Sequence, residues 1–285
     1  MDISINSAQV ERWADFSSDY NPIHFEVAAA RALGAEGPLV HGMLPVILML
    51  NHAEQRLDAA PSAARSARLR LRRPLEIGRA ARLKCQPRPT GRTELSLALK
   101  SESGTHILGT FLGRDAPLSA AAASPHCDEW VHFREGNFSL GGSAATNTAL
   151  AFERVFPSVS TPWLVFSSYA FGEFLRRATC ELSAVALALL AHPRKEHLAV
   201  VQTGYGVDVA DTIASPDQPF GRIDCFTQPA ALVRLEQGCN ASCQIRVFRD
   251  QEPWLDVHIQ LLMKMLTSHE AQAHSAPASA LPALQ

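Results

Sequence analysis

The sequence predicts an α+β protein built from two units, each a long apolar helix wrapped by an antiparallel sheet. Three observations support this. Residues 43–57 form an almost wholly apolar segment of helical length, short strand-like segments separated by turn residues follow it, and the same order recurs beyond a stretch rich in alanine, serine and proline at 116–125. A helix that is apolar on all sides must be covered by other elements. At 285 residues the chain is long enough for two domains.

The first unit is expected to span residues 1–114. Its longest helix is expected at 43–57, where Pro45 is tolerated because it lies near the helix start. Two shorter helices are expected at 8–15 and 26–33. The strand segments are bounded by glycine and proline turns, and they are expected at residues 67–75, 80–87, 93–101 and 105–112.

The second unit is expected to span residues 128–266, after a linker at 115–127 that is rich in small residues and proline. The repeat is inferred from the order of elements alone, because the two halves share no recognisable sequence identity. Residues 267–285 are expected to form a disordered tail. A long helix is predicted at 166–190, with strands at 131–140, 198–209, 221–226, 231–249 and 254–265.

Composition excludes several classes of function. The formal net charge of −2 gives no attraction to nucleic acid. No targeting segment and no bilayer-spanning apolar stretch is recognised, so a soluble cytoplasmic protein without a membrane partner is expected. The six cysteines are scattered and are expected to be reduced thiols. Cys239 and Cys243 are the one close pair, and with no second pair nearby we expect no metal site.

The segment from Asp19 to His24 carries the clearest chemical signal. Pro22 fixes its own φ and disfavours a helical Asn21, so a helix through this stretch is not expected. Asp19 and His24 can then converge on one small molecule, and water is the natural candidate. A carboxylate and an imidazole that share a water can add it to a double bond or remove it. Each residue alone is typical of an ordinary loop, but their joint occurrence favours a site.

This segment resembles the MaoC-like dehydratases and (R)-specific enoyl-CoA hydratases of the hot-dog fold. The resemblance covers the first forty-odd residues and implies a double hot-dog fold for a chain of two such units. It implies that Asp19 and His24 hold the catalytic water, and that Asn21 braces the loop. The family commonly has glycine where this chain has Ser18. The residues that carry the resemblance are Ser18-Asp19-Tyr20-Asn21-Pro22-Ile23-His24-Phe25, Ala30 and Leu39-Val40-His41-Gly42-Met43.

The resemblance also assigns roles at the start of the apolar helix. Gly42 would offer its backbone N–H to the thioester oxygen, where negative charge develops, and the helix dipole would assist it. His41 and Met43 are candidate substrate-binding or supporting residues. For His41, a ligand contact and a structural hydrogen bond at the helix entrance are both open.

The implied reaction is reversible hydration of trans-2-enoyl thioesters, or dehydration of (R)-3-hydroxyacyl thioesters, in fatty-acid or polyketide-type metabolism. The substrate would be linked to CoA or to an acyl carrier protein, and no cofactor is expected beyond the CoA or phosphopantetheine of the substrate. The second unit would be a degenerate hot-dog domain that shapes the acyl tunnel. A homodimer of double hot-dog chains is one expected assembly. Two alternatives remain: a non-catalytic subunit that binds acyl thioesters, and a hot-dog thioesterase.

Two further groups of side chains could have either a structural or a functional role. The run Arg68-Leu69-Arg70-Leu71-Arg72 alternates as a strand with one basic and one apolar face. The basic face is either solvated or in contact with the phosphates of CoA or with an acidic carrier protein. Tyr169, Glu173 and Arg176 share one face of the second long helix, and we expect them to be surface or interface residues.

Overall fold

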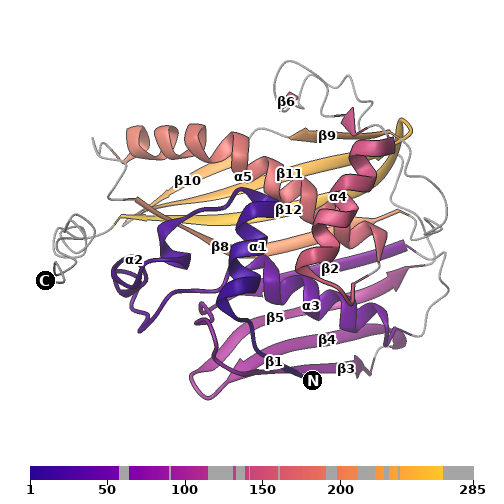
Figure 1. The fold of residues 1–285 in the computed structure, drawn as a ribbon, viewed down its shortest axis with the longest axis horizontal. Helices are drawn as coiled ribbons and strands as arrows, with labels where there is room; N and C mark the ends of the chain where they lie inside the picture. Colours follow the sequence, from indigo (N-terminus) through magenta and orange to yellow (C-terminus); the bar gives the residue numbers. More distant parts are fainter. Residues whose placement is uncertain are drawn as a thin grey trace, which may run out of the picture.

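One continuous antiparallel sheet runs through both halves of the chain in the computed structural model (Figure 1). Within the described residues it has 12 strands, and its main order is β1-β3-β4-β5-β2-β8-β12-β11-β9-β6, with β10 paired to β11 and β7 paired to β9. The structure describes residues 1–57, 64–89, 91–114, 131–132, 139–140, 142–159, 161–190, 198–210, 222–227, 231–236 and 238–265.

The strands of the first half are β1 (Asp2–Ile3), β2 (Ala64–Leu71), β3 (Ala81–Arg88), β4 (Gly91–Ser101) and β5 (Gly104–Arg114). Those of the second half are β6 (Val131–His132), β7 (Ser139–Leu140), β8 (Leu198–Val209), β9 (Ile223–Thr227), β10 (Ala231–Leu235), β11 (Gly238–Arg249) and β12 (Glu252–Met265). The helices are α1 (Ser7–Ser17), α2 (Val27–Arg31), α3 (Met43–Glu54), α4 (Gly142–Val155) and α5 (Pro162–Leu189), with a 3-10 turn η1 (Pro22–His24) between α1 and α2.

The two halves join edge to edge where β2 pairs with β8. The pairing is antiparallel and runs from Arg65 opposite Val209 to Arg70 opposite Gly204. The sheets of the two predicted units are therefore joined into one within the chain. Figure 1 shows α3 and α5 on the same face of this sheet, and residues of both helices belong to one hydrophobic core.

The helix α3 lies in the core as its composition predicts. Nine of its residues are buried, so it has almost no solvent face, as expected for a helix that is apolar all round. Its first turn accepts Pro45 because the amide that proline lacks has no acceptor inside the helix there. In the second half, α5 buries Trp163 and Phe166 completely. Within the described residues, no helix combines the length and apolarity needed to cross a membrane.

Two expectations about elements need correction, and one helix was not predicted. The strand predicted over 231–249 is a hairpin of β10 and β11, because a turn before Gly238 interrupts the alternation. Over 131–140 the described residues form two short strands, β6 and β7. The helix α4 was not predicted, since the glycine and small polar residues at its start are typical of a loop. It packs against α1 through Phe152, and Phe156, directly after its last residue, contacts Trp13 of α1. Residues 115–127 and 267–285, which were predicted as linker and tail, lie outside the described residues.

Candidate active site

The segment after α1 turns sharply at Ser18. This residue adopts a left-handed conformation with φ of 58°, and its N–H donates to the Ala14 carbonyl to close the helix. A left-handed conformation favours glycine, which is the residue the resembling family commonly has at this position. The Ser18 hydroxyl accepts a hydrogen bond of 3.0 Å from Nε of Arg176 in α5. The second half therefore contacts the turn that places Asp19.

Asn21 connects the loop both to itself and to the second half. Its Oδ1 accepts from the Ile23 N–H, and its Nδ2 donates to the Val200 carbonyl on β8 at 3.0 Å. Pro22 follows and begins the 3-10 turn η1. Proline suits this first position, since its fixed φ matches a helical turn and its missing N–H leaves no unsatisfied donor.

Asp19 and His24 meet at the end of this loop, as the sequence predicts. Asp19 Oδ2 lies 3.8 Å from His24 Nε2, too far for a direct hydrogen bond. His24 Nδ1 donates to the Leu39 carbonyl at 2.9 Å, because a carbonyl can only accept. In the neutral ring, Nε2 therefore keeps a lone pair that faces the carboxylate. The side chains are 7% and 22% exposed for His24 and Asp19, respectively, so water retains access to the pair.

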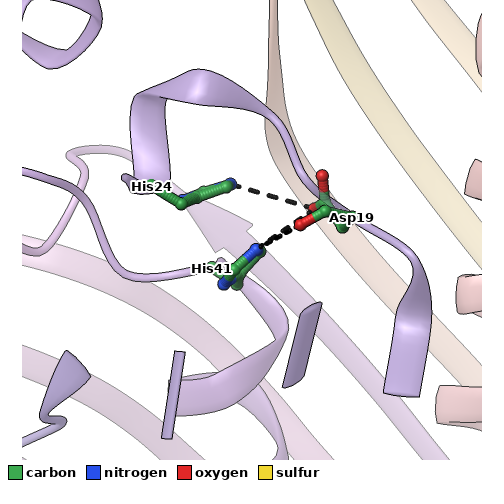
Figure 2. A group of neighbouring side chains, drawn as sticks. All are labelled: Asp19, His24 and His41. Carbon is green, nitrogen blue, oxygen red and sulfur yellow. Dashed lines mark hydrogen bonds and ion pairs between the residues drawn. The ribbon is translucent and has the colours of Figure 1, made fainter. Parts of the chain in front are cut away.

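His41 packs directly against this pair (Figure 2). Its ring stacks on that of His24 with 3.6 Å between centroids. Its Nε2 lies 2.9 Å from the backbone carbonyl of Asp19 and 3.8 Å from Oδ2 of the same residue. The carbonyl requires an N–H donor, so Nε2 carries the proton and cannot act as a base. His41 Nδ1 is buried and finds no hydrogen-bond partner among the described residues.

Burial controls the protonation of the three groups. It lowers the pKa of His24, against the attraction of Asp19, and lowers the pKa of His41 to about 2. Burial also raises the pKa of Asp19, against the opposing influence of His24. Both histidines are therefore neutral near pH 7, and His24 is an available base.

The same three side chains could in principle hold a metal ion. Asp19, His24 and His41 each offer one ligand atom, and these atoms lie within 4.8 Å of one another. However, Nε2 of His41 already donates to the Asp19 carbonyl, so a metal at that atom would have to displace this hydrogen bond. The hydrogen-bonded arrangement suits acid–base chemistry on water better than it suits a metal.

The site opens into a cavity of about 470 Å³ that is lined by both halves. The catalytic candidates lie at one part of its wall, together with Gly42 and Met43 at the start of α3. Amides in the first turn of a helix lack acceptors inside it, and the helix dipole there favours negative charge. From the second half, the cavity is lined by Phe171, Leu175, Val200, Gln202, Leu261 and Leu262, among others.

Steric contact with neighbouring side chains requires glycine at position 42, whereas its backbone conformation does not. Its φ of −56° and ψ of −32° are open to any residue. A Cβ built at this position would lie 2.5 Å from Oε1 of Gln202 and 2.6 Å from Cδ2 of Leu71. The close approach of these two side chains therefore requires glycine.

The arginines predicted on a basic strand face lie in β2 and directly after it. Arg68 and Arg70 are on the exposed face of β2 while Leu69 is buried, so the predicted alternation is confirmed. Arg72 and Arg73, just after β2, line the cavity.

On α5, Glu173 is buried and forms an ion pair with Arg176. The expectation of a surface residue is therefore wrong for Glu173, whereas Arg176 is exposed.

Sequence reasoning missed the contribution of particular residues in the second half. Gln202 and Arg176 lie about 160 residues from the motif they contact, and no local pattern marks either of them. The one available signal was Gly172, at which a Cβ would lie 2.9 Å from Cα of Ser17. A glycine within a long apolar helix often marks such a close approach.

Comparison with known proteins agrees with this geometry. Residues 1–88 match the family described as the MaoC like domain. A mitochondrial 3-hydroxyacyl-[acyl-carrier-protein] dehydratase of Arabidopsis thaliana is 34% identical over 73 residues, which are 26% of this chain and 43% of that protein. The similarity to this relative thus spans less than half of its length.

Solved structures extend the comparison to the second half. A MaoC domain protein from Chloroflexus aurantiacus J-10-fl superposes with a TM-score of 0.55 at 9% identity, covering 93% of each chain. A Mycobacterium tuberculosis protein described as having a double hot-dog fold gives a TM-score of 0.50 at 15% identity, covering 92% of this chain and 94% of that one. At such identities the likeness concerns the fold, and it confirms the predicted double hot-dog. The chain thus has a double hot-dog fold, and its residues 1–88 match the MaoC like domain family.

Proposed function

We propose that this protein is a hydro-lyase that adds water to trans-2-enoyl thioesters, or removes it from (R)-3-hydroxyacyl thioesters. The observation that carries this proposal is the pairing of Asp19 with the free lone pair of His24 Nε2, 3.8 Å apart in the wall of a cavity that the start of α3 also lines. The similarity to a plant 3-hydroxyacyl-[acyl-carrier-protein] dehydratase supports the same reaction class.

In the hydration direction, a water held between Asp19 and His24 attacks C3 of the enoyl thioester. As the bond from the water oxygen to C3 forms, His24 Nε2 takes a proton from the water, and the electron pair of the double bond moves toward the thioester oxygen. The Gly42 N–H and the dipole of α3 stabilise that negative charge. C2 then takes a proton from the Asp19–His24 pair, and the thioester carbonyl re-forms. The pair returns to its starting state, so hydrogen and hydroxyl have been added across the double bond.

The remaining lining suits the rest of such a substrate. Apolar side chains from both halves, including Leu75, Phe171 and Leu261, provide a surface for an acyl chain. Arg72 and Arg73 line the same cavity and are exposed, so they are available to the phosphate of CoA or of a carrier-bound phosphopantetheine. These placements support a thioester linked to one of these two carriers.

Incubation with crotonyl-CoA, and with crotonyl-loaded acyl carrier protein, tests this proposal. Ultraviolet absorbance reports the conjugated enoyl thioester, and a thiol reagent reports free thiol. Loss of absorbance without free thiol is the expected result. Release of thiol would instead identify a thioesterase. Unchanged absorbance with both carriers, together with measurable binding of the thioester, would identify a non-catalytic binding subunit.

The stereochemistry of the product gives a second test. The family resemblance predicts that hydration yields the (R)-3-hydroxyacyl thioester. Chiral chromatography of the hydrolysed and derivatised product measures this directly. Formation of the (S) product would contradict the mechanism transferred from the family even if hydration itself were observed.

A further inference from the structure

The strand β8 contains an irregularity beside the active site. Gly204 pairs with Gln260, and the next partner along β12, Leu261, pairs with Gln202, so Thr203 is an extra residue on β8. Such a bulge changes which side chains face each side of the sheet and often occurs next to active sites. Without it, the alternation from the buried Tyr205 and Val207 would turn Gln202 away from the helices.

The bulge brings Gln202 to the helix side of the sheet. Gln202 lies opposite Leu261, which belongs to the hydrophobic core together with Ile259, the partner of Tyr205. Gln202 accordingly lines the cavity that also contains Asp19 and His24. A polar side chain from the second half thus shares a cavity with the catalytic candidates of the first half.

The carboxamide of Gln202 lies against the first turn of α3. Its Oε1 would be 2.5 Å from a Cβ at Gly42, and its Nε2 donates to Sδ of Met43 at 3.4 Å. Thioether sulfur is a weak acceptor. Among the described residues this is the one hydrogen bond that the Gln202 side chain makes. Its N–H groups are therefore available for a better acceptor in the cavity.

We propose that Gln202 is a catalytic residue, whose Nε2 donates to the thioester oxygen alongside the backbone N–H of Gly42. This inference rests on the proposed function, and it gives the second half a direct role in the chemistry. The carbonyl oxygen becomes strongly negative as water adds to C3, so a hydrogen bond to it strengthens in the transition state. Exchange of the weak N–H···S contact for this bond therefore favours the transition state over the ground state.

The substitution Gln202→Met tests this role. Methionine keeps the length of the side chain but has no N–H donor. The matched control is Gln260→Met, because Gln260 is an exposed neighbour on β12 that faces away from the cavity. Loss of one oxyanion donor lowers kcat by about 10² to 10³. For Gln202→Met we expect a loss of this order in kcat with a much smaller rise in KM, and for Gln260→Met we expect wild-type kinetics.

A binding measurement separates a catalytic contact from a structural one. The probes are butyryl-phosphopantetheine and S-butyl-phosphopantetheine, which differ only in the carbonyl and share the arm common to CoA and carrier protein. Wild type is expected to prefer the butyryl probe. Gln202→Met should reduce that preference by about two- to tenfold, the value of one neutral hydrogen bond, and should leave the affinity for the S-butyl probe unchanged.

Gln202→Glu provides a second variant of the same shape, and its carboxylate offers no N–H and repels the developing charge. Its kcat should fall at least as far as that of Gln202→Met, and thermal unfolding would verify that both variants fold. If wild type hydrates enoyl thioesters while both variants match the Gln260→Met control, this inference is wrong and the proposed function stands. Equal loss of affinity for both probes would assign Gln202 a structural role and also overturn it. A wild type that neither hydrates enoyl thioesters nor binds either probe would overturn the proposed function itself.

Discussion

The two halves share one architecture but differ at the start of their long helices. In the first half, the chain reaches α3 through the loop that carries Asp19 and His24. In the second half, the described residues reach α5 through α4, whose start carries no carboxylate–imidazole pair. Among the described residues, the acid–base pair in the cavity therefore comes from the first half, although both halves supply a helix and strands to the same sheet and core.

The long helix of the second half supports the site of the first half. At 28 residues, α5 is more than twice as long as the 12-residue α3. Its residues Phe171 and Leu175 line the cavity, Gly172 allows contact with Ser17, and Arg176 bonds to Ser18. The second half thus contacts the loop that carries the acid–base pair, although within the described residues it contributes no such pair to the cavity.

Removal of the second half is the strongest test of this comparison. A polypeptide ending at residue 115 loses the β8 partner of β2, as well as α5 and the second wall of the cavity. The exposed strand edge and apolar surface favour aggregation. We expect the fragment to be insoluble or inactive, measured by size-exclusion chromatography and by the crotonyl thioester assay with the full chain as reference. A soluble and fully active homodimer of the fragment would show that the second half is dispensable.

Substitution of the acid–base pair tests whether the chemistry belongs to the first half. Asp19→Asn and His24→Ala should each lower kcat by about two orders of magnitude or more, since each removes a positioned proton carrier. Circular dichroism should show a retained fold. His52→Gln is a suitable control, because His52 lies near the far end of α3 and outside the cavity lining. Near wild-type turnover in either variant would contradict the assigned roles.

Stability at mildly acidic pH probes the buried histidines of the first half. The pKa of His41 is about 2 in the fold and about 6.5 in an unfolded chain. Between these values the unfolded state binds a proton that the folded state does not. The free energy of unfolding should therefore fall as the pH drops below about 6.5, by about 1 kcal/mol per pH unit for one such group. His24, whose pKa is also lowered, acts in the same direction, and Asp19, whose pKa is raised, acts in the opposite one.

Urea unfolding between pH 7 and pH 5 measures this dependence. His41→Gln removes the titrating ring and keeps an N–H donor for the Asp19 carbonyl. Its unfolding free energy should vary less steeply with pH than that of wild type. An identical slope in the two proteins would mean that His41 is not held neutral by burial. The pH dependence of activity offers a parallel measurement. Because the pKa of His24 is lowered, the fall of kcat on the acidic side of its pH profile should occur below pH 6.5.

Features that depend on residues close together in the sequence could be predicted, and features that depend on contacts between distant segments could not. The strand β8 was predicted with its correct ends, and α3 with its correct start, because strong hydrophobic patterns define them. Asp19 and His24 were paired correctly because five residues and one proline determine their approach. Gln202 and Arg176 could not be found in this way, since their contacts with Gly42 and Ser18 depend on a bulge and on helix packing between distant segments.

The smallest predicted effect concerns the turn at Ser18, where the two halves touch. Ser18→Ala and Ser18→Gly both delete the hydroxyl that accepts from Arg176, so they lose the same contact with the second half. They differ in the backbone, because alanine keeps the cost of the left-handed conformation and glycine removes it. We expect Ser18→Gly to be more stable than Ser18→Ala by about 1 kcal/mol in urea unfolding. Equal stability of the two variants would mean that residue 18 leaves the left-handed region once the bond to Arg176 is lost, and that α5 holds this turn in place.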